Sequence, residues 1–430
     1  MIQILLLLGV AIANNLRFRA KGTIPNLWNI QASTCYGVMF DAGSSGTRVY
    51  VYSWNCRETQ TMPYVSLTEK SIEKKVKPGI SSFATKLNEI PAYLQPLIDF
   101  ALINIPKSMR AYTPIMLGAT AGMRLLPLQQ QTQIMKEVQR VFLKSGLLFL
   151  SEQWARVITG QEEGAYMWLS LNYLLQTMSD QEQVTTIDLG GASTQISFKP
   201  KGKIEDGVMD LIIPNLNEYE IFSSSYLLYG MDQALIQVHK QFQDNDTFTI
   251  TTPCYFSGYE NVYEHDARFK VIGQGNYQEC RRLIRQYLNN EPENCQHSNC
   301  GINGQYQPKI DGDIIYGISG IQSMVSLFGF ENYTLTQYSN KVVDFTSLVW
   351  SDIEQIPEYI SNPYITTDYF SSIYVDELLS YGYGIGKDQL LYSPDEINHI
   401  SPSWTVAAMF YQLAQIQCQY DSPVCIQLIK

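Results

Sequence analysis

Two stretches of the chain repeat one short pattern at a distance of 147 residues. Residues 38–52 read VMFDAGSSGTRVYVY, and residues 185–198 read TTIDLGGASTQISF. Aligned without gaps, the copies share an Asp (Asp41 and Asp188), a Gly two places on and a Thr six places on. An apolar strand, a turn of small residues and a second strand indicate a β-hairpin. Because the offset is about one domain length, the repeat predicts a duplicated domain rather than a short repeat array.

Length and charge agree with a two-domain protein that does not bind nucleic acid. A chain of 430 residues is too long for one simple core. The net charge is −11, and only 17% of the residues are charged, so neither a disordered acidic tail nor a nucleic-acid-binding surface is expected. The longest basic cluster, EKKVK at residues 73–77, is interpreted as a solvated face. If an acidic chain of this kind handles phosphates, it must attract them locally, through backbone N–H groups and a divalent cation.

The first residues predict entry into the secretory pathway. Residues 1–15, MIQILLLLGVAIANN, are interpreted as a signal peptide, because the apolar run is short for a membrane span and ends in small residues. Since this segment has no Lys or Arg, a retained signal anchor stays an alternative. No other stretch approaches membrane length, so no stable membrane span is expected. The sequons at Asn245 and Asn332 agree with a secreted or lumenal protein.

Eight cysteines in a chain with a signal sequence predict disulfides. Cys35 and Cys56 lie symmetrically about the Ser45-Gly46 turn, so a hairpin would place them on facing positions. Two other pairs are close enough to close small loops, which leaves the last two cysteines for each other. Connectivity stays a hypothesis at this point, and zinc is the disfavoured alternative, because no CxxC pair occurs. The suspected pairs are Cys35–Cys56, Cys254–Cys280, Cys295–Cys300 and Cys418–Cys425.

The pattern along the chain is mixed α/β. Strand-like runs at residues 49–53, 62–66, 114–117, 185–187 and 195–198 alternate with helical stretches. One predicted helix places Ile134, Val138 and Val141 on a single stripe and ends at Gly146. A turn at Gly160 and the long apolar helix after it indicate passage into a second unit. No low-complexity linker follows, so the two domains are expected to meet closely across a cleft.

The repeated turn has the chemistry of a phosphate site. A turn of Gly and Ser brings several backbone N–H groups close to one point, and such a concavity holds a phosphate. A carboxylate beside bound phosphates is repulsive unless a divalent cation lies between them, so Asp41 and Asp188 are predicted to hold a metal ion or its waters. One such loop alone would be an ordinary β-turn. The repetition favours two loops that clamp an oligophosphate from both sides.

Two further segments supply a hydroxyl and a base. In IMLGATAGMRLL, residues 115–126, a strand leads into a loop of small residues that offers Thr120, with Arg124 behind; alone it could be a tight strand-to-helix turn. In ITGQEEGAYMW, residues 158–168, the turn at Gly164 can aim one carboxylate at the phosphates, as general-base attack by water requires. For Glu162 the alternative is a favourable charge at a helix N-terminus.

Five motifs, in this order, resemble the apyrase conserved regions of the ecto-nucleoside triphosphate diphosphohydrolases. They are DAGSSGTR, GATAGMR, ITGQEEGAYMW, DLGGASTQ and SPSWTVAAMF. CGINGQYQP and YLLYGMDQA are similar to further segments of that family, so the resemblance covers almost the whole chain after the leader. It implies an α/β fold with two RNase-H-like domains of the actin, hexokinase and Hsp70 superfamily and an active site between them. Domain I is assigned to residues 30–155 plus 402–430, and domain II to residues 156–401.

The resemblance also implies a role for each site residue. Glu163 would be the catalytic base, with Ser193 and Gln195 helping to hold the attacking water. A Ca²⁺ or Mg²⁺ ion would be surrounded, mostly through water, by Asp41, Asp188, Thr120 and Trp404. The phosphates would face Ser44, Ser45, Gly46, Thr120, Ala121, Gly190, Gly191 and Ala192. The implied reaction removes the terminal phosphate of nucleoside tri- and diphosphates by direct attack of water.

Two departures and two alternatives accompany this prediction. Many membrane-bound members have His where this chain has Gly46, so the loop resembles the soluble type. Residues 314–323 read IIYGISGIQS where the family often has aromatics near FSxFYY, so base stacking is not assigned to this segment. An exopolyphosphatase of the same superfamily is disfavoured by GQEEGAYMW, SWT and the cysteines. A non-catalytic nucleotide-binding protein is disfavoured because it would not need Glu163.

Overall fold

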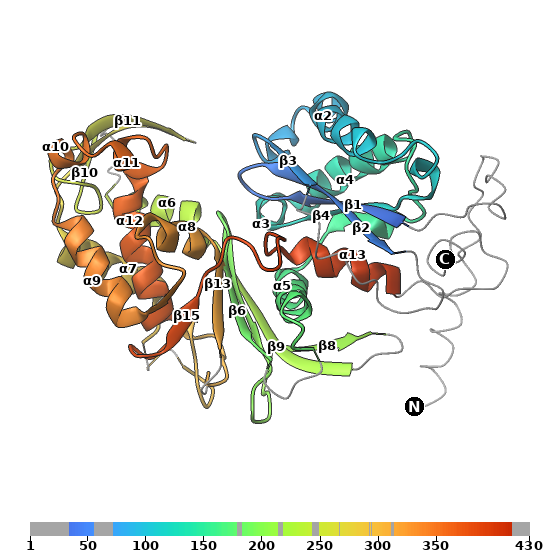
Figure 1. Ribbon diagram of the computed structural model, residues 1–430. Coiled ribbons are helices and arrows are strands. Elements are labelled where there is room, and N and C mark those ends of the chain that lie inside the picture. Colours follow the sequence, from blue (N-terminus) through green and yellow to red (C-terminus); the bar gives the residue numbers. More distant parts are fainter. Residues whose placement is uncertain are drawn as a thin grey trace.

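Two mixed β-sheets, one in each lobe, form the frame of the molecule (Figure 1). The computed structural model describes residues 34–55, 72–178, 183–213, 218–242, 249–265, 267–291, 293, 295–310 and 314–414. The strand predicted at residues 62–66, the leader and the sequon at Asn245 lie outside these ranges. Asn332 lies within them and is exposed.

The first sheet has five strands in the order β3-β2-β1-β4-β5. They are β1 (Thr34–Ala42), β2 (Thr47–Asn55), β3 (Ile72–Val76), β4 (Ile115–Ala119) and β5 (Ala155–Val157). Strands β1, β2 and β3 form an antiparallel meander, and β4 and β5 run parallel to β1. Helices α2 (Ile90–Ile103) and α4 (Leu128–Phe142) lie against this sheet on its outer side (Figure 1).

The second sheet repeats that topology. It has seven strands in the order β14-β15-β13-β6-β7-β9-β8. Its strands are β6 (Thr185–Leu189), β7 (Ser193–Phe198), β8 (Val208–Ile212), β9 (Glu218–Leu227), β13 (Ile315–Ser319), β14 (Asn332–Thr334) and β15 (Leu390–Tyr392). Here β6, β7 and β9 form the meander, and β13 and β15 run parallel to β6. The two repeated hairpins of the sequence are therefore β1–β2 and β6–β7, at equivalent places in two equivalent sheets.

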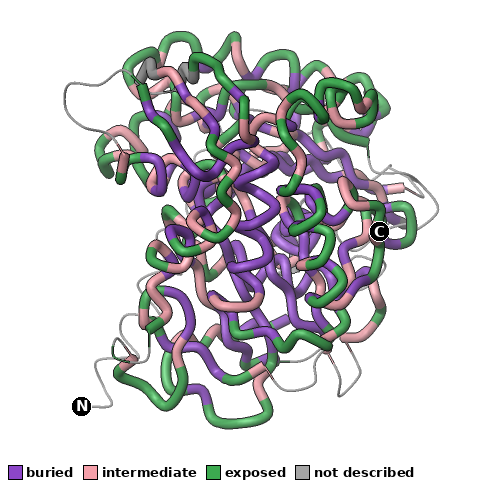
Figure 2. The backbone as a smooth tube through the Cα atoms, turned by 90° about the vertical axis from the view of Figure 1, so that its left-hand side faces the viewer, coloured by how far each residue is buried: buried purple, intermediate pink, exposed green. Residues whose placement is uncertain are grey.

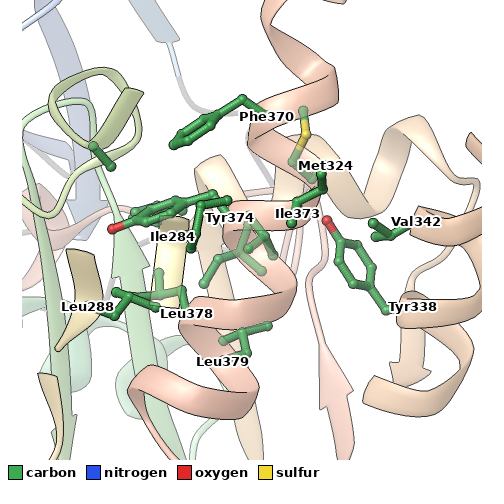
Figure 3. Close-up of a cluster of buried hydrophobic side chains, with 14 of the residues drawn as sticks. Ile284, Leu288, Met324, Tyr338, Val342, Phe370, Ile373, Tyr374, Leu378 and Leu379 are labelled. Atoms are coloured by element: carbon green, nitrogen blue, oxygen red, sulfur yellow. The ribbon is translucent and has the colours of Figure 1, made fainter. Parts of the chain in front are cut away.

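Several helices cover the outer side of the second sheet. They are α6 (Met231–Lys240), α7 (Tyr277–Leu288), α8 (Gly320–Leu327), α9 (Leu335–Thr346) and α12 (Ile365–Glu377). Beyond them lie α10 (Trp350–Ile353), α11 (Pro357–Ile360) and a small sheet of β10 (Thr249–Thr252), β11 (Glu260–His265) and β12 (Ala267–Gly273). Figure 3 shows how side chains of α7, α8 and α9 meet those of α12, such as Ile373 and Tyr374, which are fully buried. This packing gives the second lobe a core of its own.

Alternate side chains of the first hairpin pack into two different hydrophobic cores, because successive residues of a strand point to opposite faces of the sheet. On β1, Val38 and Phe40 pack outward among the residues of α2 and α4, whereas Met39 packs inward. On β2, Val49 packs outward and Tyr50 inward. The inner face of the first sheet is therefore apolar and needs a covering layer.

That layer consists of α5 (Gly160–Leu174) and α13 (Trp404–Ala414), which lie between the two sheets (Figure 1). Helix α13 packs on β1 and on α5, and α5 packs on β6, β7 and β9. Both helices are buried on nearly every side, which explains why their sequences are apolar all round. In Figure 2 buried chain accordingly fills the centre of the molecule. The assignment of residues 402–430 to domain I stays a prediction, because α13 packs both on β1 and on α5, which was assigned to domain II.

Two details of the sequence-based prediction were wrong. Helix α4 ends at Phe142, and its buried side chains include Met135 and Phe142, whereas Val141 is only half-buried. Gly146, the predicted end, lies in the following loop with a φ of 81°. In the first hairpin Cys35 pairs with Trp54 rather than facing position 56, because the four-residue turn is centred one residue earlier than predicted.

The disulfides Cys254–Cys280 and Cys295–Cys300 are present as predicted. Cys35 is also disulfide-bonded, but Cys56 and the suspected pair Cys418–Cys425 lie outside the described residues. Within the described part of the chain, no cluster of His, Cys, Asp and Glu side chains has the composition of a metal cage. No described helix is both long and apolar enough to cross a membrane.

We predict that His239 makes the second lobe sensitive to acid. The ring is buried in the last turn of α6 and stacks on Tyr255, with centroids 5.3 Å apart, and burial lowers its pKa to about 4. Since the unfolded chain binds this proton near pH 6.5, the contribution to stability is full above that pH and falls as the pH drops toward 4. The loss amounts to about 3 kcal/mol.

Comparing urea unfolding of the wild type and His239→Phe between pH 7 and pH 4 measures this contribution. Buried carboxyls with raised pKa values, such as Asp368, act in the opposite direction in both proteins, so the difference between the two slopes isolates His239. Parallel curves would contradict the prediction.

Candidate active site

The first small-residue loop, residues 43–46, joins β1 to β2 and lies beside the end of β4. The backbone N–H of Thr120 donates to the carbonyl of Ala42 over 3.1 Å, which ties the start of α3 (Ala121–Arg124) to the loop. Thr120 and Ala121 are buried, and Ser45 is exposed at the tip. The predicted phosphate residues of the first lobe are therefore neighbours.

The second loop, residues 190–192, is held by the segment that opens α6. The carbonyl of Gly191 accepts hydrogen bonds from the N–H groups of Asp232 (2.9 Å) and Gln233 (3.0 Å). The carbonyls of Gly190 and Ala192 are bound in the same way by Met231 and Leu228. This explains the YLLYGMDQA motif, since its backbone donors fix the shape of the loop.

The two loops meet each other. A Cβ atom added to Gly191 would lie 2.7 Å from Ser44 Oγ of the first loop and 2.5 Å from Asp232 Oδ2. Only glycine leaves room for so close an approach. The structure thus brings the repeated motifs together, and it adds Asp232, which the sequence analysis did not single out.

Helix α5 separates the two adjacent glutamates. Thr159 and Glu162 form a capping box, and the Glu162 carboxylate also accepts two hydrogen bonds from Arg156, at 2.6 and 2.9 Å. Glu163 is the next residue along the helix and points in a different direction. It is buried, and its Oε2 atom lies 2.8 Å from Arg124 Nη1. Glu162 therefore caps the helix, as the alternative interpretation held, and Glu163 points to the meeting point of the lobes.

Arg124 connects the lobes at this point. Besides the ion pair with Glu163, its guanidinium donates to Ser193 Oγ (3.1 Å) and to the carbonyl of Ile158 (3.2 Å). The sequence analysis noted Arg124 only as lying behind a loop. The available signal for Arg124 was a basic residue four positions after Thr120. Its contacts with Ile158 and Ser193, which are 34 and 69 residues away, depend on how the chain packs.

Ser193 and Gln195 form a short hydrogen-bonded row beside this ion pair. Gln195 Nε2 donates to Ser193 Oγ over 2.6 Å and to Ser225 Oγ over 2.9 Å. Ser193 and Gln195 are buried on β7, and Ser225 lies opposite Gln195 on β9. The three predicted catalytic residues are thus linked to one another, with Arg124 between Glu163 and Ser193.

Burial raises the pKa of each carboxyl group at the site. The pKa of Glu163 rises to about 7, chiefly by desolvation, against the opposing effect of Arg124 and with the added repulsion of Asp188 and Asp41. Desolvation likewise raises the pKa of Asp41 to about 6 and raises that of Asp188. The three buried carboxyl groups therefore interact with one another in a poorly solvated region, where negative charge is unfavourable.

These residues fit a divalent cation. Asp41 Oδ1 and Asp188 Oδ1 are buried and have no hydrogen-bond partner among the described residues. Carboxylate oxygens are the ligands that Ca²⁺ and Mg²⁺ prefer, and a cation between them would relieve the repulsion. The Trp404 ring lies against the backbone of Gly118 on β4, and Gly118 pairs with Asp41 on β1. With two carboxylates available, the remaining ligands would be waters or hydroxyls.

Ser319 is a further neighbour of this point. It hydrogen-bonds to the Asp188 carboxylate, and with a φ of 59° it joins β13 to α8. Thr120 joins β4 to α3 at the corresponding place in the first sheet. Sequence reasoning missed Ser319, and the duplicated topology is the signal that identifies it.

The fold and the site define a class of protein. Two sheets of the same topology, each with its own layer of helices, enclose two facing small-residue loops, and an Asp lies just before each loop. Over residues 29–424 the sequence matches the GDA1/CD39 (nucleoside phosphatase) family, and the chain belongs to that family. It is therefore a hydrolase, as the motifs implied.

Named relatives can be aligned with this chain over most of their length. Rat ectonucleoside triphosphate diphosphohydrolase 1 is 31% identical over 418 residues, covering 87% of this chain and 80% of the relative. Probable apyrase 3 of Arabidopsis thaliana is 30% identical, covering 90% and 84%. A nucleoside triphosphate hydrolase structure from Neospora caninum matches with a TM-score of 0.64 at 14% identity, covering 88% of this chain and 92% of the other, which supports the fold.

We predict that Gly230→Ala disturbs the second loop. A Cβ at Gly230 would lie 2.3 Å from the backbone nitrogen of Ser193 and 2.4 Å from that of Ala192, so the loop backbone must move. Overpacking of this kind costs about 1–3 kcal/mol in unfolding free energy.

Gly386→Ala is the matched control, because Gly386 is exposed and an added Cβ would meet no atom within 4 Å. Thermal unfolding of both variants tests the prediction. Equal melting temperatures would show that the loop tolerates displacement.

Proposed function

We propose that the protein is a secreted or lumenal nucleotide phosphohydrolase that removes the terminal phosphate of nucleoside tri- and diphosphates with a divalent cation. The observation that carries this proposal is the position of Glu163. It is a buried carboxyl group with a pKa near 7, beside Asp41 and Asp188, where the two loops meet. Such a group can accept a proton from water at neutral pH.

The two loops would hold the phosphates. Ser44, Ser45, Gly46 and Ala121 belong to the first lobe, and Gly190, Gly191 and Ala192 to the second. Because Ser44 lies against Gly191, a phosphate chain at this point would contact both lobes at once. Small residues allow the backbone to come close to phosphate oxygens.

Asp41 and Asp188, with Thr120 and Trp404 around them, would hold the cation mostly through its waters. A bound Ca²⁺ or Mg²⁺ would neutralise charge on the phosphates and on the two carboxylates. The unpartnered oxygens Asp41 Oδ1 and Asp188 Oδ1 support this assignment.

Glu163 would act as the general base and accept the proton of the attacking water. Ser193 and Gln195 would orient that water, since their side chains are held in place by Arg124 and Ser225. Arg124 lowers the pKa of Glu163 against the effect of burial, so it keeps the carboxyl group partly ionised. No covalent intermediate is needed for direct attack by water.

Nucleotides are proposed as substrates because the chain belongs to a nucleoside phosphatase family and its relatives are named for nucleoside tri- and diphosphates. Polyphosphate is the alternative substrate from the same superfamily. The proposed location rests on the disulfides Cys254–Cys280 and Cys295–Cys300, which form in oxidising compartments.

We predict that phosphate release from ATP and ADP requires a divalent cation. Excess EDTA should abolish it, and Ca²⁺ or Mg²⁺ should restore it, because the buried carboxylates and the phosphates otherwise repel each other. A phosphate-release assay with ATP, ADP and polyphosphate measures both the requirement and the substrate. Full activity in excess chelator would contradict the cation assignment, and a preference for polyphosphate would contradict the nucleotide assignment.

We predict that Glu163→Gln lowers turnover by about 10² to 10⁴ while nucleotide affinity persists, because the variant keeps the size of the side chain and loses the proton acceptor. Glu162→Gln is the control and should cost far less, since Glu162 serves the helix cap and Arg156. Turnover and nucleotide affinity at saturating Ca²⁺ decide between the two residues. Equal losses of turnover would disprove the assignment of the base.

A further inference from the structure

Strand β3 presents two neighbouring lysines to opposite sides of the first sheet. Lys74 lies on the outer side, where its Nζ is 5.9 Å from the ring centroid of Phe100 in α2. Lys75 lies on the inner side, and its Nζ donates to Ser45 Oγ at the tip of the first loop over 3.4 Å. The sequence analysis interpreted this EKKVK segment as a solvated face, and both lysines are indeed exposed, but only Lys75 reaches the first loop.

The pairing of the strands explains the position of Lys75. Asp41 on β1 pairs with Arg48 on β2, and Arg48 pairs with Lys75 on β3. Directly paired residues lie on the same face of a sheet, so these three side chains form one row that starts at the proposed cation site. The row lies on the inner face with Met39 and Tyr50, the face turned toward the second lobe.

Lys75 also occupies the space beside Gly46. A Cβ atom at Gly46 would lie 2.9 Å from Lys75 Cε and 2.6 Å from the carbonyl of Val76. The lysine stem therefore covers the position where a side chain at residue 46 would extend. The ammonium group can lie at the edge of the loop because residue 46 is a glycine and has no side chain to displace it.

The charges around Lys75 favour an anion. Arg48 and Lys77 both lie close enough to repel the Lys75 ammonium, whereas Asp41, with a smaller effect, attracts it. An anion bound beside these cations would reduce their mutual repulsion. Arg48 is already engaged by Tyr50 (3.0 Å) and Glu73 (3.7 Å). Within the described ranges Lys75 forms no ion pair with a carboxylate, and its hydrogen bond to the neutral Ser45 hydroxyl is long.

The second lobe closes the other side of this row. Lys77, two residues further along, donates to the Tyr364 hydroxyl over 3.4 Å. Tyr364 comes directly before α12, in the second lobe. Lys75 is therefore at the junction of the lobes, where the proposed substrate binds.

We propose that Lys75 is a substrate-binding residue, whose ammonium contacts a phosphoryl oxygen of a nucleoside di- or triphosphate, or of released inorganic phosphate, on the first loop. An ammonium group suits this role because it is a compact charge with three donors, which can replace the long bond to a neutral hydroxyl with a shorter one to an anionic oxygen. The inference rests on the proposed function and adds a residue to its phosphate site.

Lys75→Met and Lys74→Met are a matched pair, because each removes one positive charge from the same strand and only the first faces the loop. We expect Lys75→Met to raise KM for ADP about 10-fold and to weaken inhibition by inorganic phosphate by a similar factor. We expect Lys74→Met to change either value less than about 2-fold, as is usual for exposed charges. Lys75→Arg should recover part of the loss, since it restores the charge.

The measurements are phosphate release from ADP and calorimetric titration of each protein with inorganic phosphate. A wild-type chain that releases no phosphate from any nucleotide would overturn the proposed function and this inference with it. An active wild type with equal values for the two lysine variants would overturn the inference alone. Melting temperatures of both variants should match the wild type, because each lysine is exposed.

Discussion

The burial of three interacting carboxyl groups between the two lobes is the constraint on which the rest of the structure depends. Asp41, Asp188 and Glu163 come from a strand of each sheet and from α5, and each has a raised pKa because water is largely excluded. Like charges in such a place destabilise the folded chain. The apolar layer of α5 and α13 offsets that cost, since it joins the inner faces of both sheets in one continuous core.

Duplication and asymmetry have different roles in this molecule. The two sheets share one topology, so each supplies a hairpin with an Asp at the same strand position. The charged groups that make the two halves of the site different are not duplicated. Arg124 comes from the first lobe and reaches Glu163 and Ser193, and Lys75 borders only the first loop. The symmetric frame brings two equivalent loops together, and Arg124 and Lys75 make the surroundings of the two loops different.

Much of the site could be predicted because its signals are local. The Asp of each hairpin, the small residues of each turn and the two candidate glutamates are all defined within a few neighbouring positions. Disulfides with short separations, such as Cys295–Cys300, follow from the same kind of local geometry. The predicted register of the first hairpin differs from the observed one, since the turn is centred one residue earlier. A turn of four small residues offers several nearly equivalent centres.

The sequence by itself determined the duplicated hairpins and the mixed α/β class and identified the candidate site residues, because period-two alternation and turn composition act over a few residues. Tertiary structure alone decided that Arg124 bridges to Glu163, that Ser319 bonds to Asp188, and that Lys75 rather than Lys74 faces the loop. These contacts join residues 30 or more positions apart. The first two depend on how the two sheets pack around α5 and α13, and the third depends on the pairing of β3 with β2; no local pattern encodes either.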